Sequence, residues 1–89
     1  MTAWTDDAQP ALTSIYRMQW EEAQQCHVLL FPEGMIKLNG PAAEILQRCD
    51  GKTSVAALVA DLERTFGESG LHADVLEFLE QAHGRHWIR

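Results

Sequence analysis

The cysteine and histidine side chains are the groups in this sequence that could bind a metal ion or act as nucleophiles. They are Cys26, Cys49, His27, His72, His83 and His86. A zinc site is expected to use two cysteines about two to four residues apart, followed by histidines at near-helical spacing. The two cysteines are far apart and no such pair is repeated, so we expect no metal site and no cofactor bound by these residues.

Nucleophilic catalysis is also not favoured by the positions of these groups. Cys26 is next to His27, but neighbouring side chains of a strand point to opposite faces and diverge. Cys49 is on the apolar face of an expected helix, where a buried thiol is usual. A phosphate-binding loop is absent from the sequence, because its glycines occupy turn and cap positions, as at Gly34, Gly40 and Gly51. We therefore expect a protein that is not an enzyme.

Length and composition restrict the class of protein. The 89 residues provide one small core, and the hydrophobic fraction of 46% and charged fraction of 22% are typical of a globular domain. The formal net charge is −6, with 7 Lys and Arg against 13 Asp and Glu, which disfavours nucleic acid and anionic membranes as partners. The apolar runs at residues 28–31 and 55–60 are too short to span a membrane. With no secretory signal visible at its start, we expect a cytoplasmic protein.

The first half of the chain predicts an arm and three strands. Residues 1–14 lack a sustained period and predict a flexible N-terminal arm, which leaves residues 15–89 as the single domain. Tyr16, Met18 and Trp20 alternate with polar residues, which is typical of a half-buried strand.

A hairpin is predicted next. Two apolar runs, residues 28–31 and 35–38, flank Pro32-Glu33-Gly34, which suits a three-residue hairpin loop with a bulge. In the second run, Met35 and Lys37 are expected to face one way and Ile36 and Leu38 the other.

The second half has helical spacing. Apolar residues recur three and four apart over residues 42–49, 55–66 and 75–82. Asn39 can cap the first helix, Thr53 or Ser54 can cap the second, and Gly67 and Gly84 are expected stops. Three strands followed by three helices predict an α+β domain with a small antiparallel sheet. An edge strand of such a sheet can accept an extended peptide from another chain.

An ordered set of short segments resembles the PqqD family of pyrroloquinoline quinone (PQQ) biosynthesis. These segments are Leu29-Leu30-Phe31-Pro32-Glu33-Gly34, Leu38-Asn39, Ala43-Glu44-Ile45-Leu46 and Cys49-Asp50-Gly51. The resemblance covers nearly the whole chain except the arm, and implies a winged-helix-like fold known as a RiPP recognition element. It also implies a peptide chaperone that binds the precursor peptide PqqA and presents it to PqqE. PqqE is a radical SAM enzyme that cross-links a Glu and a Tyr of that peptide.

The resemblance also implies where the partners bind. In related recognition elements, the peptide adds as an antiparallel strand to the third strand and packs against the third helix. Carried onto this sequence, the peptide-binding residues are Met35, Ile36, Lys37, Leu38, Asp74, Val75, Phe78, Leu79, Gln81 and Ala82. A contact with the partner enzyme is the hypothesis for the shared turn residues Pro32, Glu33, Gly34, Asp50 and Gly51, whose ordinary role is turn geometry.

Two alternatives remain open at this point. A winged-helix domain that binds DNA would need cations on its third helix, but that segment carries Asp74, Glu77 and Glu80 and no Lys or Arg before Arg85. A homodimer that pairs its exposed sheet edges would compete with a peptide for the same strand.

Overall fold

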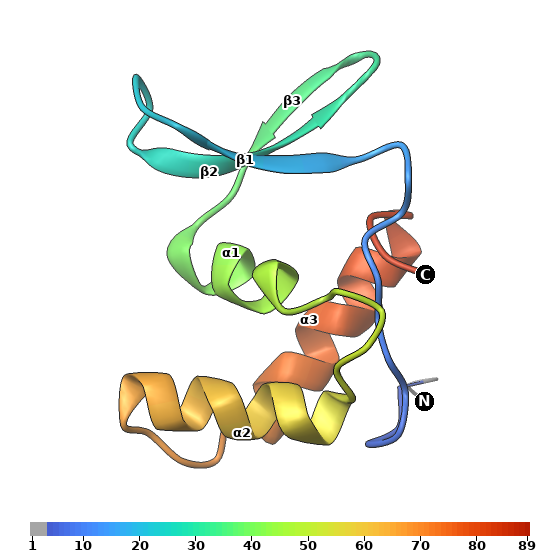
Figure 1. Cartoon of the computed structure of the whole chain (residues 1–89), viewed down its shortest axis with the longest axis vertical. Coiled ribbons are helices and arrows are strands. Elements are labelled where there is room, and N and C mark those ends of the chain that lie inside the picture. The colour runs from blue at the N-terminus through green and yellow to red at the C-terminus, as the bar shows by residue number, and fades with distance from the viewer. Residues whose placement is uncertain (1–3) are drawn as a thin grey trace.

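Three strands are followed by three helices along residues 4–89, the part of the chain that the computed structural model describes (Figure 1). The elements are β1 Arg17–Glu21, β2 Cys26–Phe31, β3 Gly34–Lys37, α1 Gly40–Gln47, α2 Val55–Phe66 and α3 His72–Gly84. Figure 1 shows the sheet at one end of the long axis and α2 at the other, with α1 between them and α3 running alongside. The predicted order of strands and helices is confirmed.

The sheet is antiparallel in the order β1-β2-β3, which leaves β1 and β3 as its edges. Met18, Leu29 and Ile36 lie opposite one another across the three strands and pack on the core. The hairpin between β2 and β3 differs from the three-residue loop expected from the sequence. Phe31 pairs directly with Gly34, so the connecting loop has only two residues and Gly34 belongs to β3.

The expected alternation along the third strand is confirmed, since Ile36 and Leu38 face the helices while Met35 stays 46% exposed. The alternation expected at the first strand holds only in part. Trp20 is 48% exposed, and its indole packs edge-on against the His27 ring with the centroids 5.1 Å apart. Its Nε1–H donates to the exposed Glu22 carboxylate at 2.8 Å, so this polar end of the ring is held at the surface.

Capping groups explain where α1 and α2 begin and where α2 ends. The Asn39 side chain accepts the Ala42 N–H at 2.8 Å, and the Ser54 hydroxyl accepts the Ala57 N–H at 3.1 Å. Gly67 ends α2 with φ of 64°, a left-handed conformation that glycine adopts without a side-chain clash. Ser54 is therefore the cap of the second helix rather than Thr53.

One apolar core lies between the sheet and the three helices. Its members come from every layer and include Leu29 of β2, Leu58 of α2 and Leu79 of α3, each with no exposed surface. Ile88 is 2% exposed and Trp87 packs against the same cluster, so the end of the chain folds back onto the core. Burial of these apolar groups is what holds α3 at a fixed position beside the sheet.

The segment before β1 is packed against the domain, unlike the flexible arm expected over residues 1–14. Leu12 forms a bridge with Ile88, Ala11 forms one with Asp50, and Pro10 is fully buried. These contacts join residues that are far apart in the sequence. A local pattern of apolar residues cannot reveal contacts of this kind. The packed unit begins before residue 15, whereas residues 1–3 of the expected arm lie outside the described residues.

Two features of residues 4–89 concern membranes and metals. No helix in this part of the chain combines the length and the apolar character needed to span a bilayer. Within the same residues, no three His, Cys, Asp or Glu side chains gather where they could hold a metal ion.

Candidate functional site

The edge of β3 carries backbone groups without partners in the sheet. The Leu38 N–H donates to the His27 carbonyl at 2.9 Å, and Ile36 lies opposite Leu29 two residues earlier in the same register. In an antiparallel ladder, the groups that point to the partner strand alternate with those that point away. The N–H and C=O of Met35 and Lys37 therefore point away from β2, toward a side on which none of residues 4–89 forms a strand.

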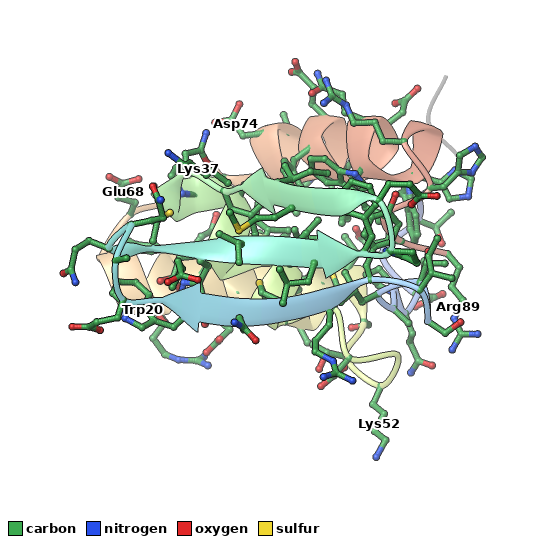
Figure 2. The ribbon with its side chains drawn as sticks, turned by 90° about the horizontal axis from the view of Figure 1, so that it is seen from above. Trp20, Lys37, Lys52, Glu68, Asp74 and Arg89 are labelled. Atoms are coloured by element: carbon green, nitrogen blue, oxygen red, sulfur yellow. The ribbon has the colours of Figure 1, made fainter. Side chains whose placement is uncertain are left out.

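A groove runs beside this edge, between β3, the start of α1 and α3. Its volume is about 350 Å³. It is lined by Lys37, Leu38, Asn39, Pro41, Ala42, Ile45, Asp74, Phe78, Gln81, Ala82, Arg85 and Trp87. Figure 2 looks down on the sheet and shows α3 on the β3 side of it. We call this hollow the strand–helix groove.

Several predicted binding residues present accessible side chains here. Lys37, Asp74 and Gln81 are exposed on the rim of the strand–helix groove, and Phe78 is half-buried within it. Met35 contributes its outward-pointing backbone, while its side chain lies on the face of the sheet away from the helices. The strand–helix groove thus brings Asp74, Phe78 and Gln81 of α3 to the edge of β3.

Other predicted residues are buried. Leu38 and Ala82 are 5% and 1% exposed and form part of the groove floor, while Val75 is 2% exposed and lies nearer the start of α3. Leu79 has no exposed surface and lines neither this groove nor the neighbouring hollow. Leu79 therefore anchors α3 on the core instead of offering a contact to a ligand.

Sequence reasoning missed the wall that α1 and the end of the chain contribute. Pro41 and Ile45 of α1 line the groove, as do Arg85 and Trp87 after the main body of α3. The Arg85 guanidinium carbon lies 5.4 Å from the centre of the Trp87 ring, a cation–π contact that holds both side chains at the groove. The large apolar Trp87 so near the end of the chain was the available signal for this wall.

The charged side chains of the groove and of α3 bear on whether this helix could bind DNA. Lys37 and Arg85 are the cations among the groove-lining residues, and Asp74 is the carboxylate. Glu77 and Glu80 add exposed negative charge elsewhere on the same helix. A helix with this charge would be repelled by the phosphates of a DNA groove, which disfavours its use as a recognition helix.

The residues predicted to contact a partner enzyme lie in two separate places. The hairpin tip at Pro32 and Glu33 is exposed at the sheet end of the molecule, and the loop between α1 and α2 lies further down the long axis (Figure 1). Asp50 and Gly51, in that loop, have structural roles. The Asp50 carboxylate accepts the N–H groups of Lys52 and Thr53, bonds that lower its pKa.

Gly51 is held by the segment before β1. Its φ is 77°, and its N–H donates to the Pro10 carbonyl at 2.9 Å. A β-carbon at Gly51 would stand 3.3 Å from that of Ala11. The local backbone therefore explains why Asp and Gly stand at positions 50 and 51, and a contact with a partner enzyme is not needed to explain them.

The two cysteines do not form a reactive pair. Cys49 is 4% exposed, and burial raises the pKa of its thiol to about 12, so the thiolate is scarce near neutral pH. Cys26 is half-buried in β2 and is not joined to Cys49 in a disulfide.

Comparison with known sequences gives a consistent assignment. Residues 26–88 match the family model of coenzyme PQQ synthesis protein D (PqqD). A PqqA binding protein from Azotobacter vinelandii is 59% identical over 80 residues, covering 89% of this chain and 87% of the relative. One from Methylococcus capsulatus is 53% identical over 78 residues, covering 88% and 84% of the two chains.

Two solved structures share the fold. The NMR structure of the PqqD part of Methylobacterium extorquens PqqCD, described as a functional and stand-alone RiPP recognition element, matches with a TM-score of 0.80. It is 27% identical, and the match covers 99% of this chain and 96% of that one. The crystal structure of PqqD from Xanthomonas campestris matches with a TM-score of 0.58 at 31% identity, covering 96% and 97%.

Proposed function

The chain belongs to the PqqD family, and from this premise we propose that it is a RiPP recognition element that binds the precursor peptide PqqA in PQQ synthesis. The peptide adds as an antiparallel strand to β3 and packs its side chains into the strand–helix groove. The observation that carries this proposal is the row of outward-pointing N–H and C=O groups at Met35 and Lys37, next to an apolar groove.

Affinity and selectivity arise from different parts of this site. Two outward residues of β3 provide two N–H donors and two C=O acceptors, which can pair with any extended backbone. Alternate side chains of the added strand point toward the helices and enter the groove beside Phe78 and Trp87. The peptide therefore needs apolar residues at alternate positions, while Arg85 on the groove wall favours an acidic residue near it.

The bound peptide is presented to the radical SAM enzyme PqqE, which performs the chemistry. This chain acts without catalysis, in agreement with relatives that are named for binding PqqA and not for a reaction. Of the residues expected to contact the enzyme, Pro32 and Glu33 at the hairpin tip are exposed, and we assign the contact to them. Asp50 and Gly51 are tied into the loop before α2, so their contribution to that contact is to hold the loop in shape.

An NMR titration tests the proposal. A synthetic PqqA peptide is expected to shift the amide signals of residues 35–38 and 74–82 in a saturable manner. Signals of β1, at the opposite edge of the sheet, are expected to move little. Peptide-induced shifts confined to surfaces outside β3 and α3 would remove the proposed site.

Two further measurements address the alternatives. A mixed-sequence DNA duplex at low salt is expected to cause no saturable shifts, because the net charge is −6 and α3 is acidic. Sedimentation with and without PqqA reports whether a dimer forms through β3, since such a dimer would dissociate as the peptide takes the shared edge.

A further inference from the structure

A second hollow lies next to the strand–helix groove, and we propose that it seats the part of PqqA that precedes the added strand. This inference rests on the proposed function, because it extends the path of the same peptide. The hollow, which we call the helix hollow, has a volume of about 470 Å³ between α1, the end of α2 and the start of α3. The ligand it fits is an apolar side chain accompanied by a basic one.

The walls of the helix hollow are mostly apolar. Ile45 comes from α1, Leu62 and Phe66 from α2, and Leu71 and Val75 from the start of α3. Phe66 is the exposed member, with 50% of its surface open to solvent, although it is one of the largest apolar side chains of the chain. Covering this ring would remove apolar surface from water, which gives a ligand a reason to enter.

The two hollows adjoin each other. Pro41, Ile45 and Asp74 line both the strand–helix groove and the helix hollow. A chain that leaves the end of β3 along the groove therefore reaches the helix hollow at these shared residues.

Strand polarity decides which part of the peptide enters. β3 runs from Gly34 to Lys37, and the helix hollow lies beyond the Lys37 end, where α1 begins. A guest strand antiparallel to β3 has its first residues opposite Lys37 and its last residues opposite Gly34. The segment that lies over the helix hollow is thus the one on the N-terminal side of the added strand.

The charges of the helix hollow favour a basic side chain. Its lining includes Glu44, Glu68 and Asp74 and contains no Lys or Arg. Glu44 is already paired with Arg48 at 2.9 Å. The carboxylates of Glu68 and Asp74 form no ion pair within residues 4–89, so they remain available to a cation of the peptide.

A pair of variants and a shortened peptide test this assignment. Phe66→Ala is expected to weaken binding of full-length PqqA about tenfold, because a partly buried aromatic anchor is lost. The same variant is expected to bind with unchanged affinity a PqqA peptide that lacks the residues before the added strand. Ile15→Ala is the matched control, since Ile15 is 57% exposed and lies just before β1, which forms the edge of the sheet opposite to β3.

Separate experiments test the preference of the helix hollow for a basic side chain and the direction in which the PqqA chain runs. Glu68→Lys is expected to weaken binding of full-length PqqA at low salt, with a smaller effect at high salt because the interaction is screened. A nitroxide label on the N-terminus of PqqA is expected to broaden the amide signals of Phe66, Glu68 and Leu71. The same label on the C-terminus is expected to broaden signals at the hairpin between β2 and β3.

The outcomes separate this inference from the proposed function. Full-length PqqA that shifts β3 but binds the Phe66→Ala variant as tightly as the wild type would overturn the inference alone. Broadening of Phe66 by the C-terminal label would overturn the direction, and with it the assignment of the N-terminal segment. A Phe66→Ala variant that changes only self-association would assign the hollow to a second copy of the chain. A full-length peptide that does not bind at all overturns both proposals.

Discussion

Replacing Lys37 by proline removes one backbone N–H from the free edge of β3, and so tests whether that group contributes to peptide binding. The Lys37 N–H points away from β2, so a proline at this position removes no hydrogen bond of the protein's own sheet. Proline is tolerated on edge strands for this reason, and the preceding residue, Ile36, is already extended as proline requires. The variant is therefore expected to fold while losing one of the two outward donors.

The size of the effect follows from one hydrogen bond. A hydrogen bond between protein groups contributes a net of about 0.5–1.5 kcal/mol, and a peptide carbonyl left beside the proline ring loses its partner as well. We expect a total loss of about 1–2 kcal/mol of binding free energy, which is about 5–30-fold in Kd for PqqA.

Calorimetric titration of PqqA measures this change, and two variants separate its causes. Lys37→Ala removes the side chain on the groove rim but keeps the N–H, so it reports the side-chain contribution. Ile36→Pro removes an N–H that points to β2, so it is expected to destabilise the sheet itself. A folded Lys37→Pro variant that binds PqqA as tightly as Lys37→Ala would refute strand addition to β3.

Three other predictions concern the scaffold. Gly51→Ala is expected to lower the free energy of unfolding by about 2 kcal/mol in urea titrations, because its φ of 77° disfavours a side chain; an unchanged midpoint would contradict this. The hydrogen bond and charge of Arg48 lower the pKa of Asp61, so this pair stabilises the fold above pH about 4 and the contribution is lost as pH falls through the lowered pKa. Urea unfolding from pH 7 to pH 3 is expected to show a smaller loss of stability in Asp61→Asn than in the wild type, and equal losses would speak against the pair. Iodoacetamide at pH 8 is expected to modify Cys26 before Cys49 in the folded protein, because burial raises the pKa of Cys49 to about 12; peptide mapping showing the reverse order would contradict this burial.

The strands and helices were predictable because their periods are local. The alternation at Met35, Ile36 and Lys37 fixes which side chains face the helices, and the structure confirms it. The same alternation does not tell which N–H groups point outward. That depends on the hairpin register, and the direct pairing of Phe31 with Gly34 differs from the three-residue loop expected from the sequence.

The groove was predictable only in outline. Helical spacing places Phe78 and Leu79 near each other on α3, but only packing against the sheet decides that Leu79 is buried and Phe78 is half-open. The wall contributed by Pro41 and Trp87 joins segments far apart in sequence, which no period records. The packing of Leu12 on Ile88 was missed for the same reason.

Amide hydrogen exchange at β3 reports whether PqqA pairs with this strand. In the free protein, the amides of Ile36 and Leu38 are expected to exchange slowly because they donate to β2, while those of Met35 and Lys37 exchange fast. Saturating PqqA is expected to slow Met35 and Lys37. If both amides continue to exchange fast while PqqA is bound, the peptide does not add to this strand.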